Sequence, residues 1–224
     1  MNIAYSQDVI AVVISLALIF AYYLFLHFRI RTDSSYTIHA LLNAGRASWV
    51  ARMMTDQKDS ILGVQTLRNA IMGSTFFAST AVVLVIGVLT LTAQGDKLAD
   101  VWHTLNPNGQ FDHRLLLFKL LILLIDLLCA FILFAQSIRL LNHVGFMISV
   151  PAKVVAPAAV AQMLIHAGLQ HRRGMRCYYF AVPMLFWLFG PVFLILANLG
   201  LVVSLYYLDQ APSDEVVMPI HPQR

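Results

Sequence analysis

The sequence predicts an all-α integral membrane protein with four transmembrane helices. Hydrophobic residues make up 59% of the 224 residues and charged residues only 12%, a composition typical of chains that lie in lipid. Four apolar stretches are each at least as long as the roughly 20 residues that cross a hydrocarbon core of about 30 Å. They cover residues 9–28, 70–93, 115–148 and 178–208. We therefore expect one transmembrane domain over residues 1–208 and a flexible tail over 209–224.

The first stretch is interpreted as a retained span. The residues before it contain no Lys or Arg, and the stretch is longer than the apolar part of a secretory signal. Arg29 and Arg31 follow it directly, with no small-residue cleavage site between. The first span is therefore expected to stay in the membrane.

Basic residues indicate the orientation of the spans. Eleven of the fifteen Lys and Arg residues lie in the segments 29–69 and 139–177, and three lie in the remaining connection and the tail. Segments rich in Lys and Arg stay in the cytoplasm, which predicts a bacterial inner-membrane protein with both termini on the non-cytoplasmic side. The net charge of +4 then reflects topology and anionic lipid, and no patch for nucleic acid is predicted.

The four spans suggest two halves of similar plan. In each half a helix enters the cytoplasm, a basic segment follows and a second helix returns. Apolar residues that recur every three or four positions predict an amphipathic helix over residues 36–54, and Pro157 and Gly168 frame a weaker counterpart over 156–169. Both are expected to lie in the membrane interface, where many such helices only pack. Turn residues predict a compact loop over 94–113.

Polar residues in the third span favour a path for a small solute or ion. Lys119 and Asp126 are seven residues apart, which places them about 20° apart around a helix and about 10.5 Å along it. Gln136 and Arg139 fall in the same half of the helix, and Asn69 stands where the second span begins. The alternative is that Lys119 and Arg139 reach outward to the interfaces. Asp126 lies near the middle of its span, so its charge needs a partner or a proton.

Small residues open the second span. The stretch VQTLRNAIMGSTFFAST places Gly73, Ser74, Ala78 and Ser79 where helix backbones can approach closely. We expect this helix to lie at the centre of the bundle or at an oligomer contact, with a pore lining as the alternative. In the fourth span, Pro183, Gly190 and Pro191 remove or weaken helix hydrogen bonds and predict a kink or an interruption near the middle of the membrane.

Two histidines end the helices that enter the cytoplasm. His27 and His143 fall at comparable depths, and a facing imidazole pair can hold a b-type haem, while a histidine cluster can hold a metal. No HExxH, CxxCH or Glu-x-x-His pair supports either cofactor, so ordinary interfacial histidines are the alternative. The sequence also lacks a Walker loop, a GxSxG elbow and a dinucleotide fingerprint, which argues against a familiar type of enzyme.

Three stretches resemble a known family. They are VQTLRNAIMGSTFFAST, FAQSIRLLNHVGF and RRGMRCYYFAVPMLFWLFGP. The chain is similar, over roughly residues 8–208, to bacterial and plant multi-span membrane proteins that share a domain of unknown function, number 599. The resemblance implies a multi-span fold and no activity. It draws attention to residues inside the three stretches: Arg68, Asn69, Gln136, Arg139, His143, Arg173, Arg176 and Pro191.

Three hypotheses for function follow. The first is an oligomeric channel or transporter-like protein for a small solute or ion, in contact with membrane lipid. The second is a non-catalytic subunit or scaffold of a larger membrane complex. The third is a b-type haem or metal protein that uses His27 and His143.

Overall fold

The computed structural model describes residues 3–32, 38–55, 60–105 and 112–209. Seven helices and no strand are found in this part of the chain, which confirms the all-α fold class. The helices are α1 (Ile3–Thr32), α2 (Ile38–Thr55), α3 (Ser60–Ala93), α4 (Gly95–Leu105), α5 (His113–Met147), α6 (Pro157–Trp187) and α7 (Pro191–Asp209). Residues 210–224, the expected tail, lie outside the described residues.

Four helices are long and apolar enough to cross a membrane. The candidate spans are Ser6–Arg29, Ile61–Ala93, His113–Met147 and Pro191–Asp209. Many of their large apolar side chains are exposed, such as Phe20 and Phe76 at 69% and 68%. Water would not tolerate so much exposed apolar surface, whereas lipid does. The prediction of an all-α membrane protein with four helices that are able to span a membrane is therefore confirmed.

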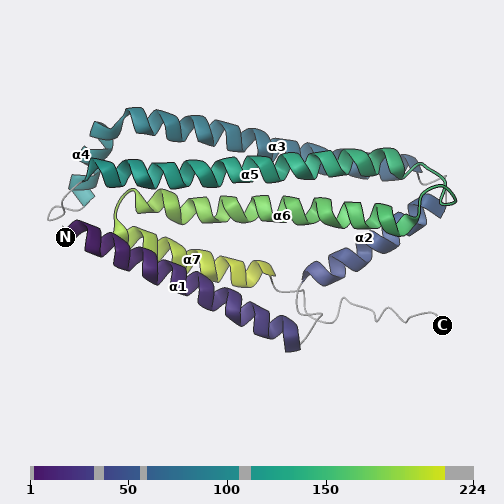
Figure 1. The fold of residues 1–224 in the computed structure, drawn as a ribbon, viewed down its shortest axis with the longest axis horizontal. Coiled ribbons are helices and arrows are strands. Elements are labelled where there is room, and N and C mark those ends of the chain that lie inside the picture. The colour runs from purple at the N-terminus through teal and green to yellow at the C-terminus, as the bar shows by residue number, and fades with distance from the viewer. Residues whose placement is uncertain (1–2, 33–37, 56–59, 106–111, 210–224) are drawn as a thin grey trace.

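The fourth span differs from the predicted one. Residues 178–208 do not form a single kinked helix, because α6 ends at Trp187 and α7 begins at Pro191. Gly190 between them has φ 141°, a backbone conformation that favours glycine, and Pro191 suits the first position of a helix. The chain therefore reverses at Gly190 instead of bending, and α6 and α7 lie side by side in opposite directions (Figure 1). Pro183 lies inside α6, which continues past it.

This reversal changes where the last helix ends. Because α7 runs alongside α1 in the same direction, Asp209 lies toward the end of α1 that carries Arg29 (Figure 1). A single span over 178–208 would have brought the chain to the opposite end. The described chain therefore ends at the other end of the bundle from Ile3, and the side of the membrane on which each terminus lies stays a prediction.

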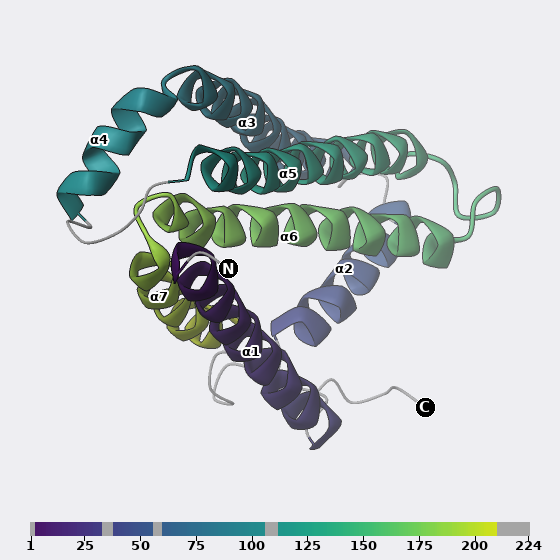
Figure 2. The same ribbon diagram turned by 60° about the vertical axis from the view of Figure 1, so that its left-hand side comes forward.

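The long helices form successive layers. Figure 2 shows α3 beside α5, α5 beside α6, and the pair α1 and α7 on the far side of α6. The α5 and α6 helices approach closely, since a Cβ at Gly174 would lie 2.9 Å from the Phe134 ring. Ser137 Oγ also donates to the Ala167 carbonyl oxygen at 2.9 Å. The α6 helix, the most polar of the five long helices, is therefore the central element.

One end of the molecule extends beyond α1 and α7. Figure 1 shows that α3, α5 and α6 continue past the ends of these two helices, and that α2 packs there. A separate apolar core holds this extension together. It includes Val50, Met53, Leu67, Val144 and Val160.

Two predictions for the connecting segments need correction. Residues 156–169 start at Pro157 as expected, but they form the beginning of α6 and not a helix of their own. The second half therefore has no counterpart of α2, and the pseudo-repeat is not confirmed. The expected loop over 94–113 contains α4, whose Trp102 is buried and whose Leu98 packs on the bundle.

Candidate functional site

Lys119 lies in a closed cluster at the α4 end of the bundle. Its Nζ is 2.8 Å from Asp8 Oδ1 and donates to the Trp187 carbonyl oxygen at 3.2 Å. Trp187 Nε1 donates to the same Asp8 oxygen at 2.6 Å. Lys119 is only 5% exposed and Asp8 only 7%. These three residues, the Lys119 cluster, join α1, α5 and α6 and balance one positive charge with one negative charge.

A second closed cluster joins α1, α6 and α7. Arg176 Nη2 donates to both carboxylate oxygens of Asp209, at 3.1 and 2.9 Å. Tyr22 donates to Asp209 Oδ2 at 2.7 Å, and Arg176 donates to the Tyr23 hydroxyl and lies 5.2 Å from the Tyr23 ring. These four residues are the Asp209 cluster, and here too the charges cancel.

A group of arginines next to the Asp209 cluster is not balanced in this way. Arg46 of α2 lies over Gly168 of α6, where an added Cβ would come within 2.6 Å of the guanidinium carbon. Its Nη1 donates to Asn43 Oδ1 at 3.2 Å. On α6, Arg172 lies four residues after Gly168, with the exposed Arg173 and the paired Arg176 close to it in sequence. We call Arg46 and Arg172 the arginine cluster.

The electrostatics of this cluster are those of a site for an anion. Burial lowers the pKa of Arg46, and burial followed by the charges of Arg46 and Arg176 lowers the pKa of Arg172, against the opposing effect of Asp209. In the part of the chain that the structure describes, no carboxylate forms an ion pair with Arg46 or Arg172. Among the described residues, these two half-buried guanidinium groups therefore have no carboxylate ion-pair partner. Their planar donors match phosphate and carboxylate oxygens.

His171 lies between the arginine cluster and α3. Its Nδ1 is 3.0 Å from Ser74 Oγ, and the rings of Phe77 and Phe134 have their centres 5.8 and 5.4 Å from the imidazole. Burial, and then the charge of Arg46, lowers the pKa of His171. The imidazole is therefore neutral at pH 7 and available to gain a proton when an anion binds.

The residues of the predicted path are spread over different surroundings. Lys119 belongs to its closed cluster, whereas Asn69, Gln136 and Arg139 are exposed on α3 and α5. Asp126 is half-buried, lies beside Cys177, and has one carboxylate oxygen, Oδ2, without a hydrogen-bond partner. Within one chain these residues line no common passage among the described pockets. A path between copies stays a prediction.

The predicted packing residues of α3 divide into two faces. Ser74 and Ala78 are buried at 1% and 6%, whereas Gly73 and Ser79 are exposed. A Cβ at Gly73 would meet nothing within 4 Å. Half of the small-residue stretch therefore packs inside the bundle, and the other half faces outward.

The structure does not bring the two candidate haem ligands together. His27 and His143 are both exposed, and the ends of α1 and α5 that carry them lie apart in both views (Figures 1 and 2). Among the described residues, no group of three His, Cys, Asp or Glu side chains is placed to hold a metal ion.

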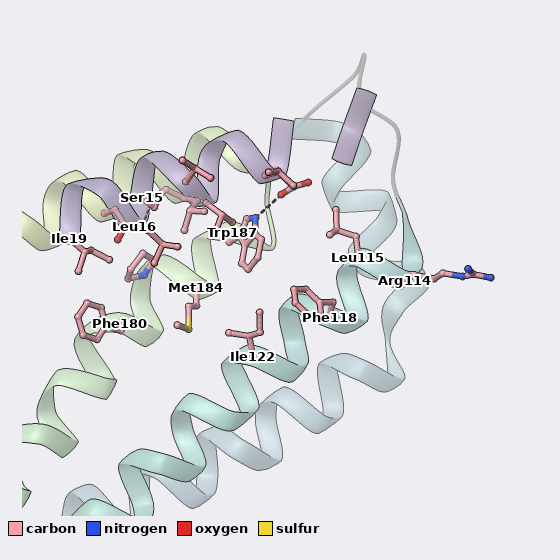
Figure 3. Close-up of a pocket in the computed structure, with 17 residues that line it drawn as sticks. Ser15, Leu16, Ile19, Arg114, Leu115, Phe118, Ile122, Phe180, Met184 and Trp187 are labelled. Atoms are coloured by element: carbon pink, nitrogen blue, oxygen red, sulfur yellow. Dashed lines mark hydrogen bonds between the residues drawn. The ribbon is translucent and has the colours of Figure 1, made fainter. Parts of the chain in front are cut away.

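A large apolar groove lies beside the Lys119 cluster. Its volume is about 720 Å³, and its walls come from α1, α5, α6 and α7. Figure 3 shows Leu16 and Ile19 facing Phe118 and Ile122 across it. No sequence pattern predicts this groove, because its walls are mostly ordinary apolar residues of four helices.

Several site residues could be found only in three dimensions. Asp8, Tyr22 and Asp209 stand at or near span ends, where single polar residues are unremarkable. Arg46 lies on a segment predicted to pack at the interface. The spacing of Arg172, Arg173 and Arg176 was visible in the sequence. It did not show that Arg176 pairs with Asp209, or that Arg172 forms no ion pair with a carboxylate among the described residues.

The sequence model of the DUF599 family, described as proteins of unknown function, matches residues 10–213. No curated protein and no solved structure matches the chain.

Proposed function

Because this chain belongs to the DUF599 family of proteins of unknown function, its role must be argued from its own residues, and we propose that it is a transporter-like membrane protein for a small anion. The anion is one with phosphate or carboxylate oxygens. It binds at the arginine cluster, with Arg46 and Arg172 as its principal ligands.

This proposal rests on the charges of Arg46 and Arg172, which have no carboxylate ion-pair partner among the described residues. Elsewhere in the described bundle, the buried charges of Lys119 and Arg176 have carboxylate partners within 3 Å. A charge removed from water without a partner is costly, so an arrangement that keeps two such charges is expected to have a ligand. Arg46 comes from α2 and Arg172 from α6, so a bound anion would be held from two sides.

The position of the site suits loading from the cytoplasm. The 19 residues of α7 span about 28 Å, close to the thickness of the hydrocarbon core, and α7 ends at Asp209 beside Arg176. The arginine cluster would then lie where α7 leaves the membrane. The extension beyond it is rich in Lys and Arg, which favours a cytoplasmic location in a bacterial inner membrane.

The outward faces of α3 and α5 support an oligomer. Asn69, Gln136 and Arg139 are exposed there among apolar neighbours, and Gly73 leaves room for a second helix. We propose that copies associate through these faces, so that their polar residues line a path between copies. A subunit role in a larger complex is the second candidate, since the same small-residue face would accept a different helix.

Cys129 offers a direct test of this contact. It is exposed on α5, seven residues before Gln136 and therefore on nearly the same face. Mild oxidation in native membranes should join two copies through Cys129, and Cys129→Ser should abolish the product while Cys177→Ser retains it. Attachment of Cys129 only to unlike proteins would favour the subunit role.

Flux of inorganic phosphate through proteoliposomes tests the function itself. Vesicles of phosphatidylcholine avoid competition by anionic lipid. Arg172→Gln is expected to reduce phosphate flux strongly, whereas the neighbouring exposed Arg173→Gln should retain most of it. Equal flux in vesicles with and without the protein, over a panel of phosphate, sulfate and acetate, would contradict the proposal.

A further inference from the structure

The apolar groove between α1 and α5 is open toward the region that lipid occupies. Phe118 and Ile122 of α5 form one wall, Leu16 and Ile19 of α1 form the other, and Phe180 and Met184 of α6 form the base (Figure 3). A volume of about 720 Å³ is within the range of roughly 300–1,000 Å³ that is common for small-molecule sites. Apolar walls of this kind exclude water, so the occupant must be lipophilic.

The charges at the groove indicate that the occupant is uncharged. Asp8 lines the upper end, but its carboxylate is bound by Lys119 and Trp187. Arg114 lies at the rim and extends away from the groove (Figure 3). No free charge is therefore directed inward to receive an ionic group.

Two buried polar atoms point to one polar group on that occupant. Ser15 is 4% exposed and Asn198 is 2% exposed, and both line the groove. Within the described part of the chain, neither Ser15 Oγ nor Asn198 Oδ1 has a hydrogen-bond partner. Asn198 Nδ2 donates to the Leu194 carbonyl oxygen at 3.1 Å, which fixes the amide orientation because that oxygen can only accept. Oδ1 is left as an acceptor, and the same groove is lined by a serine whose hydroxyl can donate.

We propose that this groove binds an uncharged lipophilic molecule that carries one hydroxyl group, a long-chain alcohol or an alkylated phenol of the membrane. Its hydroxyl donates to Asn198 Oδ1 and accepts from Ser15 Oγ, while its apolar part fills the groove and packs against the walls. Ser15 lies seven residues from Asp8 along α1, about 10.5 Å deeper. The hydroxyl therefore lies below the membrane surface, where a phospholipid headgroup does not reach.

Photolabelling of the full chain in phosphatidylcholine nanodiscs tests this proposal. The probes are photoreactive farnesol, a photoreactive alkylphenol with a single hydroxyl, and the methyl ether of each, and labelled positions are mapped by peptide mass analysis. At least one hydroxyl probe is expected to label the groove segments 8–19 and 115–122, which also distinguishes an alcohol from a phenol. A methyl ether cannot donate to Asn198 Oδ1, so its groove labelling should be about fivefold weaker.

Substitution of the two polar residues of the groove provides a second test of the proposal. Ser15→Ala and Asn198→Ala should each lower groove labelling by about fivefold, and Ser79→Ala, at an exposed serine of α3, should leave it unchanged. If a groove variant fails to fold, the comparison of probe and methyl ether on the unaltered chain still decides. Equal labelling by a probe and its ether, or labelling spread evenly over the outer face of α3, would overturn the proposal.

Discussion

The end of α6 at Trp187 and its middle at Arg172 differ in how buried positive charge is balanced. At Trp187 the ammonium of Lys119 lies 2.8 Å from Asp8 and is closed off within one chain. Near Arg172 the structure describes four arginines and one nearby carboxylate, Asp209, which Arg176 and Tyr22 already bind. The first arrangement ties helices together, whereas the second leaves donors for an outside anion. A buried charge that is paired within the chain makes a structural contact, whereas a buried charge without such a partner indicates a binding site.

The largest effect is expected from Lys119→Met. The substitution leaves the Asp8 carboxylate buried without its ion-pair partner, which should lower the free energy of unfolding by about 3–5 kcal/mol. Thermal unfolding in nanodiscs measures the loss. The double variant Asp8→Leu/Lys119→Met is the matched control and should regain most of the stability. A double variant as unstable as the single one would mean that the pair is not closed as described.

Asp209→Asn should remove the negative charge that balances Arg176 in the Asp209 cluster. Loss of the carboxylate charge should cost about 2 kcal/mol of stability, less than at Lys119 because Arg176 is partly exposed. It also leaves a third arginine without a counter-ion, so phosphate should bind more tightly. Asp100→Asn, at an exposed acid on α4, should alter neither property. Weaker phosphate binding by Asp209→Asn would show that the carboxylate helps to build the site.

Gly168→Ala is expected to weaken phosphate binding while it increases helix stability. The new Cβ would displace the Arg46 guanidinium, which is the flexible end of a long side chain and moves at little cost. Phosphate affinity should fall about fivefold, while the helix gains up to about 1 kcal/mol from the loss of glycine. Gly145→Ala, with no atom within 4 Å of its Cβ, should give the same gain with unchanged affinity. Unchanged phosphate affinity in Gly168→Ala would exclude Arg46 as a ligand.

The smallest effect concerns pH. Burial and the charge of Arg46 lower the pKa of His171 below its ordinary value near 6.5, so the unfolded chain takes up a proton before the folded chain does. Stability should therefore fall as the pH drops from 6.5 toward the folded pKa. Unfolding curves at pH 7.5 and 5.5 should show a smaller difference for His171→Asn than for the unaltered chain. The exposed His166→Asn should behave like the unaltered chain.

Much of the fold was predictable because lipid imposes simple length and hydropathy rules. Three candidate spans, the helix at residues 38–55 and the start of α6 at Pro157 agree with the sequence pattern. The reversal at Gly190 was not predicted, since Gly-Pro indicates a break without indicating its angle. The α4 helix was also missed, because its buried Trp102 stands among turn residues.

The site was less predictable because it depends on partners far apart in sequence. Lys119 and Asp126 share a helix face, but Lys119 pairs with Asp8, 111 positions earlier. Arg176 stood inside a stretch that the family resemblance marked, yet its partner Asp209 lay just beyond the predicted span. One sequence reveals which residues are polar. It does not reveal which charged residues pair and so balance each other's charge.

The central claim is that Arg46 and Arg172 form an anion site, and phosphate titration calorimetry in phosphatidylcholine nanodiscs tests it most directly. We predict saturable binding of one phosphate per chain, at least about fivefold weaker in Arg172→Gln and nearly unchanged in Arg173→Gln. No heat of phosphate binding in the unaltered chain, or an equal loss in both variants, would contradict the account.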